Sequence, residues 1–307
     1  METPASPNAA QILIDEKIRQ LKAERNSLSP VSQLPPELLG DIFTHALALD
    51  DPHYDRSGPA MSFNFSYVSQ QWRNIALSIP HLWTSLSEDH IDWSCVMLER
   101  SKTTDIVVNV NLCVAGANRG RSESIPRKVE FLEHIFERHA SRIINLLVVS
   151  SDDHPMPDFP FLTPRLHILD LWHPSSKAGT PHFSAHLLSA SPLVELRFDG
   201  YNVDWNNASF PKLKTLVLEY ICFEASSSVI PFLEALRSTR QLQKLHIHHS
   251  LPKSFDSEDL SNISPVELGS LEKLSFADFR EGCKAKLLSC LKVPSTALVT
   301  VKEVFWT

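Results

Sequence analysis

The stretch Leu213-Lys214-Thr215-Leu216-Val217-Leu218 sets the character of the second half of the chain, because its first, fourth and sixth residues are leucine. The same apolar spacing recurs in six copies at similar intervals along the chain. The six triplets are Ile143/Leu146/Val148, Leu166/Leu169/Leu171, Leu193/Leu196/Phe198, Leu213/Leu216/Leu218, Leu242/Leu245/Ile247 and Leu271/Leu274/Phe276. Their starts lie 23, 27, 20, 29 and 29 residues apart, which indicates a structural repeat rather than chance in a leucine-rich chain.

Each triplet predicts one short strand whose three apolar side chains fill the space between the strand and a returning segment. No repeat buries these side chains alone, so the copies must stack on one another. Between several copies the chain favours helices, for example over 182–190 and 229–240. The fold class is therefore α/β (α+β).

The residues that flank the inward leucines point outward along the sheet and form a candidate substrate face. Their charge changes along the stack, acidic in the middle copies and basic in the later ones, so a partner would need the complementary gradient. The alternative is that these residues are only the solvent-exposed face of a sheet and bind no partner. The candidates are Asp170, Trp172, Glu195, Arg197, Asp199, Glu219, Lys244, His246, His248 and Lys273.

Ahead of the repeats the chain is helical. Apolar residues at three- and four-residue steps predict a helix over 11–28, which either packs on the next domain or pairs with a copy of itself. A second helix follows Pro35-Pro36, and a third carries the stripe Val68, Trp72, Ile75, Ala76 and Ile79, which Pro80 ends. The segment 106–112 predicts a strand and 128–140 a helix.

Two groups of residues between Leu34 and Trp83 resemble an F-box, in particular the fungal form with its Leu-Pro-Pro-Glu start and Ile-Pro-x-Leu-Trp end. The segment spans about 50 of 307 residues. The loop 50–62 is longer than usual, and Ser69 stands where many members have Cys. The first group is Leu34, Pro35, Glu37, Leu38, Leu39, Ile42 and Phe43; the second is Val68, Ser69, Trp72, Arg73, Leu77, Pro80, Leu82 and Trp83.

The F-box resemblance implies a non-catalytic subunit that binds a Skp-type adaptor, and through it a cullin, while the rest of the chain binds an unknown protein substrate. The apolar residues at 34–43 cannot all face inward in so small a unit, so some should form a partner surface. The expected adaptor-binding residues are Leu34, Pro35, Leu38, Leu39, Ile42 and Phe43. The expected F-box core is Val68, Trp72, Ile75, Pro80, Leu82 and Trp83.

The triplets resemble the leucine-rich tail that many F-box proteins carry. Three residues past each triplet, where Asn or Cys would close the turn, copies two to six have Pro174, Tyr201, Ile221, Ser250 and Phe279. We therefore expect a small helical F-box domain followed by an irregular leucine-rich-repeat-like solenoid. The expected divisions are a loose tail (1–10), an N-terminal helix and linker (11–30), the F-box domain (31–87) and the repeat domain (88–307). The last has no evident capping repeat, as in a chain truncated at its C-terminal end.

Composition excludes several other classes. The net charge of −7, from 29 basic and 36 acidic residues, does not suit a nucleic-acid backbone. None of the eight glycines forms a dinucleotide, P-loop or nucleophile-elbow motif. Five cysteines without a C-x-x-C pair indicate reduced thiols, and we see no signal peptide or membrane span. The expected location is cytoplasm or nucleus, with no membrane partner and no cofactor.

Metal and enzyme alternatives carry less support. His182 and His186 have helical zinc spacing, but no third ligand is nearby in sequence. His246, His248 and His249 lie on or just after a strand, with His246 and His248 on one face, and are expected to face solvent or a partner. We therefore expect no metal site. The basic run Arg119, Arg121, Arg127 and Lys128 reads as a solvated loop or a weak nuclear signal. A scaffold without a ligase role, and an enzyme whose residues meet only in space, remain open alternatives.

Overall fold

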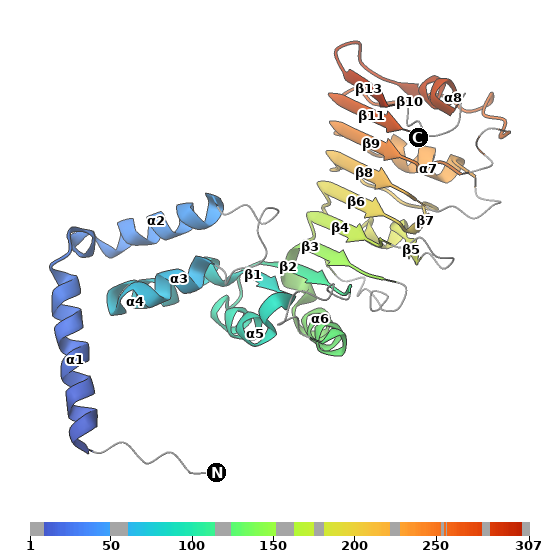
Figure 1. Cartoon of the computed structure of the whole chain (residues 1–307). Coiled ribbons are helices and arrows are strands. Elements are labelled where there is room, and N and C mark those ends of the chain that lie inside the picture. Colours follow the sequence, from blue (N-terminus) through green and yellow to red (C-terminus); the bar gives the residue numbers. More distant parts are fainter. Residues whose placement is uncertain are drawn as a thin grey trace. The chain divides into compact units, whose positions relative to one another are not determined.

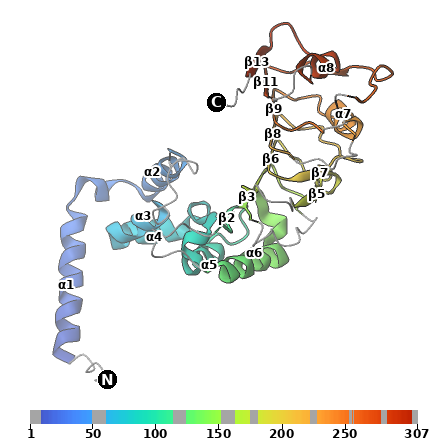
Figure 2. The same cartoon turned by 45° about the vertical axis from the view of Figure 1, so that its right-hand side comes forward.

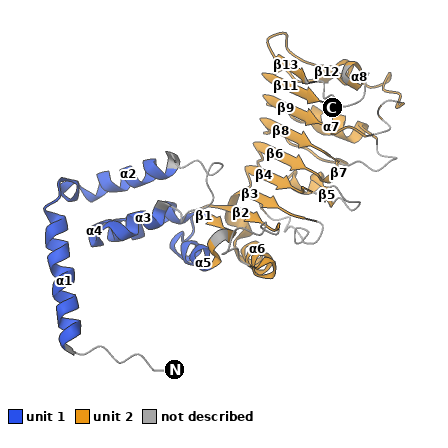
Figure 3. Cartoon of the chain, viewed as in Figure 1, with its two compact units in different colours: residues 1–85, 92–104 blue, residues 86–91, 105–307 orange. Residues whose placement is uncertain are grey.

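The computed structural model describes residues 9–49, 61–113, 124–151, 163–174, 181–221, 228–252, 255, 257–277 and 283–302. The chain forms two compact units, which Figure 3 distinguishes. Unit 1 comprises residues 1–85 and 92–104, and unit 2 comprises 86–91 and 105–307. The expected boundary at residue 87 therefore shifts, because 92–104 joins the helical unit. Trp93 packs against Phe63 with ring centroids 4.8 Å apart.

Unit 1 is helical. Its α-helices are α1 (Ala9–Ser27), α2 (Pro36–Leu49), α3 (Met61–Val68), α4 (Gln70–Ser78) and α5 (Ile91–Arg100), and its short 3-10 helices are η1 (Pro30–Gln33) and η2 (Pro80–Trp83). The helix predicted over 11–28 is confirmed as α1. Its apolar residues Ile12, Ile14, Ile18 and Leu21 stay exposed among the described residues, so the expected packing on the next domain is not observed.

Unit 2 is built on a nine-stranded sheet whose strands follow one another in chain order, as Figure 1 shows. Every paired neighbour from β2 to β13 runs parallel. The strands are β1 (Ser85–Ser87), β2 (Ile106–Asn111), β3 (Ile143–Val149), β4 (Ile168–Trp172), β6 (Glu195–Asp199), β8 (Thr215–Glu219), β9 (Lys244–His248), β11 (Lys273–Ala277) and β13 (Leu298–Lys302).

The six predicted triplets coincide with six of these strands, from β3 to β11. All eighteen triplet side chains are buried, with exposed fractions of 4% or less. The prediction that neighbouring copies bury each other's leucines is therefore confirmed. The sheet also extends beyond the triplets, since β2 pairs with β3 at one end and β13 with β11 at the other.

The return segments form a second layer on one side of the strands (Figure 2). They contain the two-stranded parallel sheets β5–β7 and β10–β12 as well as helices. Their bounds are η3 (Glu88–His90), α6 (Ile125–His139), η4 (Ala140–Arg142), β5 (His182–Ser184), η5 (Ala185–Leu188), β7 (Asn202–Asp204), α7 (Ile230–Arg237), β10 (Val266–Glu267), α8 (Cys283–Ser289) and β12 (Leu291–Lys292).

Two sequence predictions about the return segments are wrong. Residues 182–190 form a strand and a 3-10 turn rather than a helix, because Phe183 turns inward against Phe198 with ring centroids 5.1 Å apart. Lys128 does not lie in a solvated loop. It is buried in α6, where its Nζ donates a 2.8 Å hydrogen bond to the Asn111 carbonyl and lies 3.9 Å from Glu88. The helix predicted over 229–240 is confirmed as α7.

Successive strands end in a left-handed residue. Gly200 (φ 72°), Tyr220 (φ 49°) and His249 (φ 50°) directly follow β6, β8 and β9. The amide of each residue donates to a carbonyl at the end of the next strand, at 2.8–3.0 Å. These left-handed residues thus turn the chain out of the sheet while keeping the strand ends linked.

Buried polar side chains form hydrogen bonds near the turn positions that lack the usual Asn or Cys. The Ser150 hydroxyl lies 3.0 Å from Nδ1 of His173 and 2.9 Å from the Tyr201 hydroxyl, and all three residues are buried. Farther along, Ser250 Oγ accepts from the Ile221 amide at 3.2 Å and donates to the His248 carbonyl at 2.7 Å. Tyr201 and Ser250, which stand at positions where Asn or Cys is usual, therefore contribute hydrogen bonds there through their hydroxyl groups.

The Ser150 hydroxyl should stabilise unit 2. Replacing it with alanine takes a buried partner from Tyr201, and a lost partner of this kind costs about 2 kcal/mol. Tyr201→Phe removes the hydroxyl itself and should cost about half as much, since Ser150 keeps its contact with His173. Urea unfolding monitored by circular dichroism measures both. A Ser150→Ala chain as stable as the parent would contradict this assignment.

Some sequence expectations concern residues outside the described ranges. These are most of the tail 1–10, the loop at 50–60, Arg119 and Arg121 of the basic run, Phe279 at the turn position and the last five residues. Met61 and Ser62, which we expected in the loop, begin α3.

Candidate functional site

An open apolar groove of about 460 Å³ runs along α2 in unit 1. It is lined by Leu34, Leu38, Asp41, Ile42, His45 and Ala46, and we call it the α2 groove. Leu34 precedes the helix, and the other positions recur at three- and four-residue steps and so share one side of α2. Leu38 and Ile42 are 49% and 48% exposed, which is unusual for large apolar side chains on one face.

The opposite side of α2 belongs to the core. Leu39 and Phe43 are fully buried, although both were expected to contact an adaptor. Phe43 stacks on Phe65 at 4.4 Å and lies 4.9 Å from the Trp72 ring. The apolar residues of α2 that were expected to bind an adaptor therefore differ in their exposure. Leu38 and Ile42 face outward, whereas Leu39 and Phe43 pack in the core of unit 1. Pro35 is exposed and Leu34 is half-buried.

Three of the six expected core residues are buried, two are half-buried, and Val68 is exposed. Ile75, Leu82 and Trp83 are buried, and the Trp83 indole donates a 2.9 Å hydrogen bond to the Ala76 carbonyl. Trp72 and Pro80 are half-buried. Val68 is 53% exposed, because Ser69 interrupts the predicted continuous helix. Ser69 caps α4 by accepting from the Trp72 amide at 3.2 Å, so Val68 falls on the last turn of α3 instead.

In unit 2, all ten residues of the expected substrate face are exposed or half-buried, as the alternation predicts. They form separate rows across the sheet. Glu195, Lys244 and Lys273 begin their strands and share one row. Asp170, Arg197 and His246 share the middle row, and Trp172, Asp199, Glu219 and His248 end their strands in a third.

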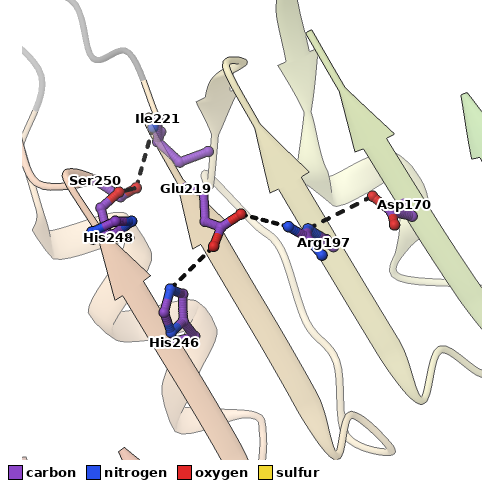
Figure 4. Close-up of polar contacts among 7 residues, drawn as sticks. All are labelled: Asp170, Arg197, Glu219, Ile221, His246, His248 and Ser250. Carbon is purple, nitrogen blue, oxygen red and sulfur yellow. Dashed lines mark hydrogen bonds and ion pairs between the residues drawn. The ribbon is translucent and has the colours of Figure 1, made fainter. Parts of the chain in front are cut away.

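The structure joins part of this face into a chain of polar contacts that crosses four strands (Figure 4). The Arg197 guanidinium donates a 2.6 Å hydrogen bond to Oε2 of Glu219, and its Nε lies 4.0 Å from Asp170. Oε1 of Glu219 lies 3.2 Å from Nε2 of His246. Together with Asp199 and His248, these residues form what we call the polar ladder. Trp172, Glu195, Lys244 and Lys273 lie outside it.

The polar ladder shifts the acidity of its carboxyl groups in opposite directions. The neighbouring His246 ring, followed by the Arg197 guanidinium, lowers the pKa of Glu219 to about 2 against the opposing effect of burial. Burial, followed by repulsion from Glu219, raises the pKa of Asp199 to about 6. Burial works to lower the pKa of Arg197, but Glu219 and Asp170 together raise it. Glu219 is therefore the firmly anionic centre of the ladder.

The Ser150–His173 contact combines a hydroxyl with an imidazole, as a nucleophilic site would. Ser150 is 0% exposed and also contacts the Tyr201 hydroxyl, so the pair is a packed structural contact rather than a site open to substrate. Burial raises the pKa of Tyr201 to about 12. His182 and His186 do not form the helical pair that their spacing suggested, since His182 lies in β5 and His186 in η5.

The chain was compared with protein-family models, curated proteins and solved structures, and none of them matches it. Within the described ranges no helix is both long and apolar enough to cross a bilayer. The functional argument therefore depends on the two surfaces described above, the α2 groove and the polar ladder.

Proposed function

We propose that this chain is a non-catalytic substrate receptor of a Skp–cullin–F-box type ubiquitin ligase. Unit 1 acts as the F-box and binds a Skp-type adaptor, and through it a cullin. Unit 2 acts as an irregular leucine-rich-repeat-like solenoid whose exposed sheet face binds a protein substrate. By holding the substrate beside the ligase, such a receptor raises the effective concentration of substrate lysines. It works in the cytoplasm or nucleus.

The observation that carries the proposal is the α2 groove. It includes Leu34, Leu38 and Ile42, three of the six residues where the F-box resemblance puts adaptor contact, and Leu38 and Ile42 are about half exposed on a helix whose other side is packed. An exposed apolar patch of this kind marks a partner surface more often than a solvated one. Asp41 and His45 at its edge supply polar contacts of the kind found on the rim of an interface.

The sheet face of unit 2 supports the substrate role. A parallel sheet with one face open to solvent presents side chains in fixed rows. On this face the rows contain Trp172 as well as acidic and basic side chains. Fixed charges in rows select a partner with the complementary arrangement. The residues of this face are Asp170, Trp172, Glu195, Arg197, Asp199, Glu219, Lys244, His246, His248 and Lys273.

Co-expression with a fungal Skp-type adaptor tests the proposal. The complex is purified through a tag on the adaptor and weighed by native mass spectrometry. We expect a one-to-one complex. If both proteins are soluble and folded but do not associate, the ligase role is wrong, and unit 1 is then a helical domain attached to a repeat scaffold.

A further inference from the structure

Three side chains of the polar ladder come together as a set of potential metal ligands. Glu219 ends β8, while His246 and His248 lie two residues apart on the neighbouring strand β9. Glu219 is the register partner of His248, and the two histidines point to the same face because strand side chains alternate. One ligand atom from each residue lies within 4.8 Å of the other two.

The distance between two of these ligand atoms is close to that found between ligands of a bound zinc ion. Tetrahedral ligands at bond lengths of about 2.0–2.2 Å lie about 3.3 Å from one another. Oε1 of Glu219 and Nε2 of His246 are 3.2 Å apart and already meet this requirement. The third ligand atom, from the half-exposed His248, lies within 4.8 Å of the other two and would have to move closer to the ion.

The His246 ring lacks the hydrogen bond that would explain its position. Its Nε2 is buried and meets no hydrogen-bond criterion within the described residues, although it lies 3.2 Å from Oε1 of Glu219. A buried imidazole nitrogen normally has a partner. A metal ion between Nε2 and the carboxylate would supply one.

The surroundings of these residues suit a cation. Arg197 donates to Oε2 of Glu219 and so holds the carboxylate with Oε1 turned toward His246, as an outer residue orients a metal ligand. Asp170, Asp199 and Glu219 outnumber the single guanidinium, which leaves the ladder with a net negative charge.

The backbone beside the ligands is strained. Tyr220 follows Glu219 and His249 follows His248, and both have left-handed φ values of 49° and 50° without being glycine. At the corresponding turn after β6 the residue is Gly200. Residues other than glycine are strained in this conformation, and such strain is concentrated at functional sites.

We propose that Glu219, His246 and His248 bind one divalent transition-metal ion, with zinc the ion that suits two imidazoles and one carboxylate. Three protein ligands leave the fourth position open to water or to a side chain of a bound protein. This inference concerns unit 2 alone and does not depend on adaptor binding. It revises the expectation that the chain has no metal site.

Titration of the full chain with Zn²⁺ by calorimetry, and with Co²⁺ by visible absorption, tests the site. We expect one equivalent of each ion and cobalt bands without sulfur charge transfer, which separates this site from binding at the exposed thiol of Cys95. His246→Ala and Glu219→Gln should each weaken binding by at least about 10-fold. Zinc should also raise the melting temperature of the parent chain.

The matched control is His182→Ala, which removes an exposed strand histidine outside the cluster and should leave binding unchanged. The ligands are half-buried surface residues, so melting curves are expected to show that the variants remain folded. The proposal is overturned if neither ion binds. It is also overturned if binding survives undiminished in both His246→Ala and Glu219→Gln, or if the cobalt spectrum shows thiolate ligation.

Discussion

Replacing Ile42 with aspartate is expected to weaken adaptor binding by at least about 100-fold, since a central anchor is worth about 2 kcal/mol or more and a charge buried in an apolar interface adds to that loss. Ile42 lies in the α2 groove and is 48% exposed, so the substitution should not disturb the core of unit 1. Calorimetric titration of the purified chain with the adaptor measures the change in Kd. Circular dichroism checks that the variant is folded.

The matched control for Ile42 is Val68→Asp. Val68 is also β-branched, lies in the same unit and is 53% exposed, but it does not line the groove. We expect its adaptor affinity to remain within about threefold of the parent, as is usual for a substitution outside the anchors of an interface. Equal losses in both variants would mean that charge anywhere on unit 1 disturbs binding. An unaffected Ile42→Asp chain would mean that the groove is not the adaptor surface.

Gly200→Ala is expected to destabilise unit 2 by about 3 kcal/mol or more. Gly200 follows β6 with a left-handed φ of 72°, which an alanine adopts only with strain. A Cβ added there would also lie 2.1 Å from the carbonyl oxygen of His173. That oxygen belongs to the backbone, so the strand ends of β4 and β6 would have to separate. Urea unfolding measures the loss.

Gly269→Ala is the control for this substitution. A Cβ at Gly269 would meet no atom within 4 Å, and its φ is not left-handed, so alanine should be neutral or slightly stabilising there. Gly200→Asn separates the two causes, since asparagine tolerates positive φ but still carries the Cβ. We expect it to be nearly as harmful as alanine. A stable Gly200→Ala chain would contradict the close packing of these strand ends.

The repeat could be predicted from the sequence because its signal is local and recurs. A triplet such as Leu213/Leu216/Leu218 requires one buried strand face, and six copies at similar spacing leave few other ways to bury so many leucines. The outward positions followed directly, since side chains alternate along a strand. The same reasoning did not assign β2 or β13 to the stack. The residues of β2 that pair with the first triplet, Ile106, Val108 and Val110, are spaced by two and do not have the triplet spacing.

The errors share a physical cause, which is that tertiary contacts decide between locally equivalent patterns. Ser69 caps a new helix, so the stripe that began at Val68 belongs to two helices. The sequence around Lys128 does not indicate that this residue is buried, because the carbonyl that accepts its hydrogen bond belongs to Asn111 on another element. The His246–His248 pair was visible in the sequence, but Glu219 precedes it by more than twenty residues. Only the register between β8 and β9 brings this third ligand beside the pair.

Site-specific photo-crosslinking tests the central claim, adaptor binding through the α2 groove, most directly. A photoreactive phenylalanine analogue is placed at position 38 in one chain and at position 68 in another, and each is co-expressed with the adaptor. Leu38 and Val68 are similarly exposed, at 49% and 53%. We expect a covalent adaptor adduct from position 38 and little from position 68. An adaptor complex that crosslinks at position 68 but not at position 38 would contradict the assignment of the groove.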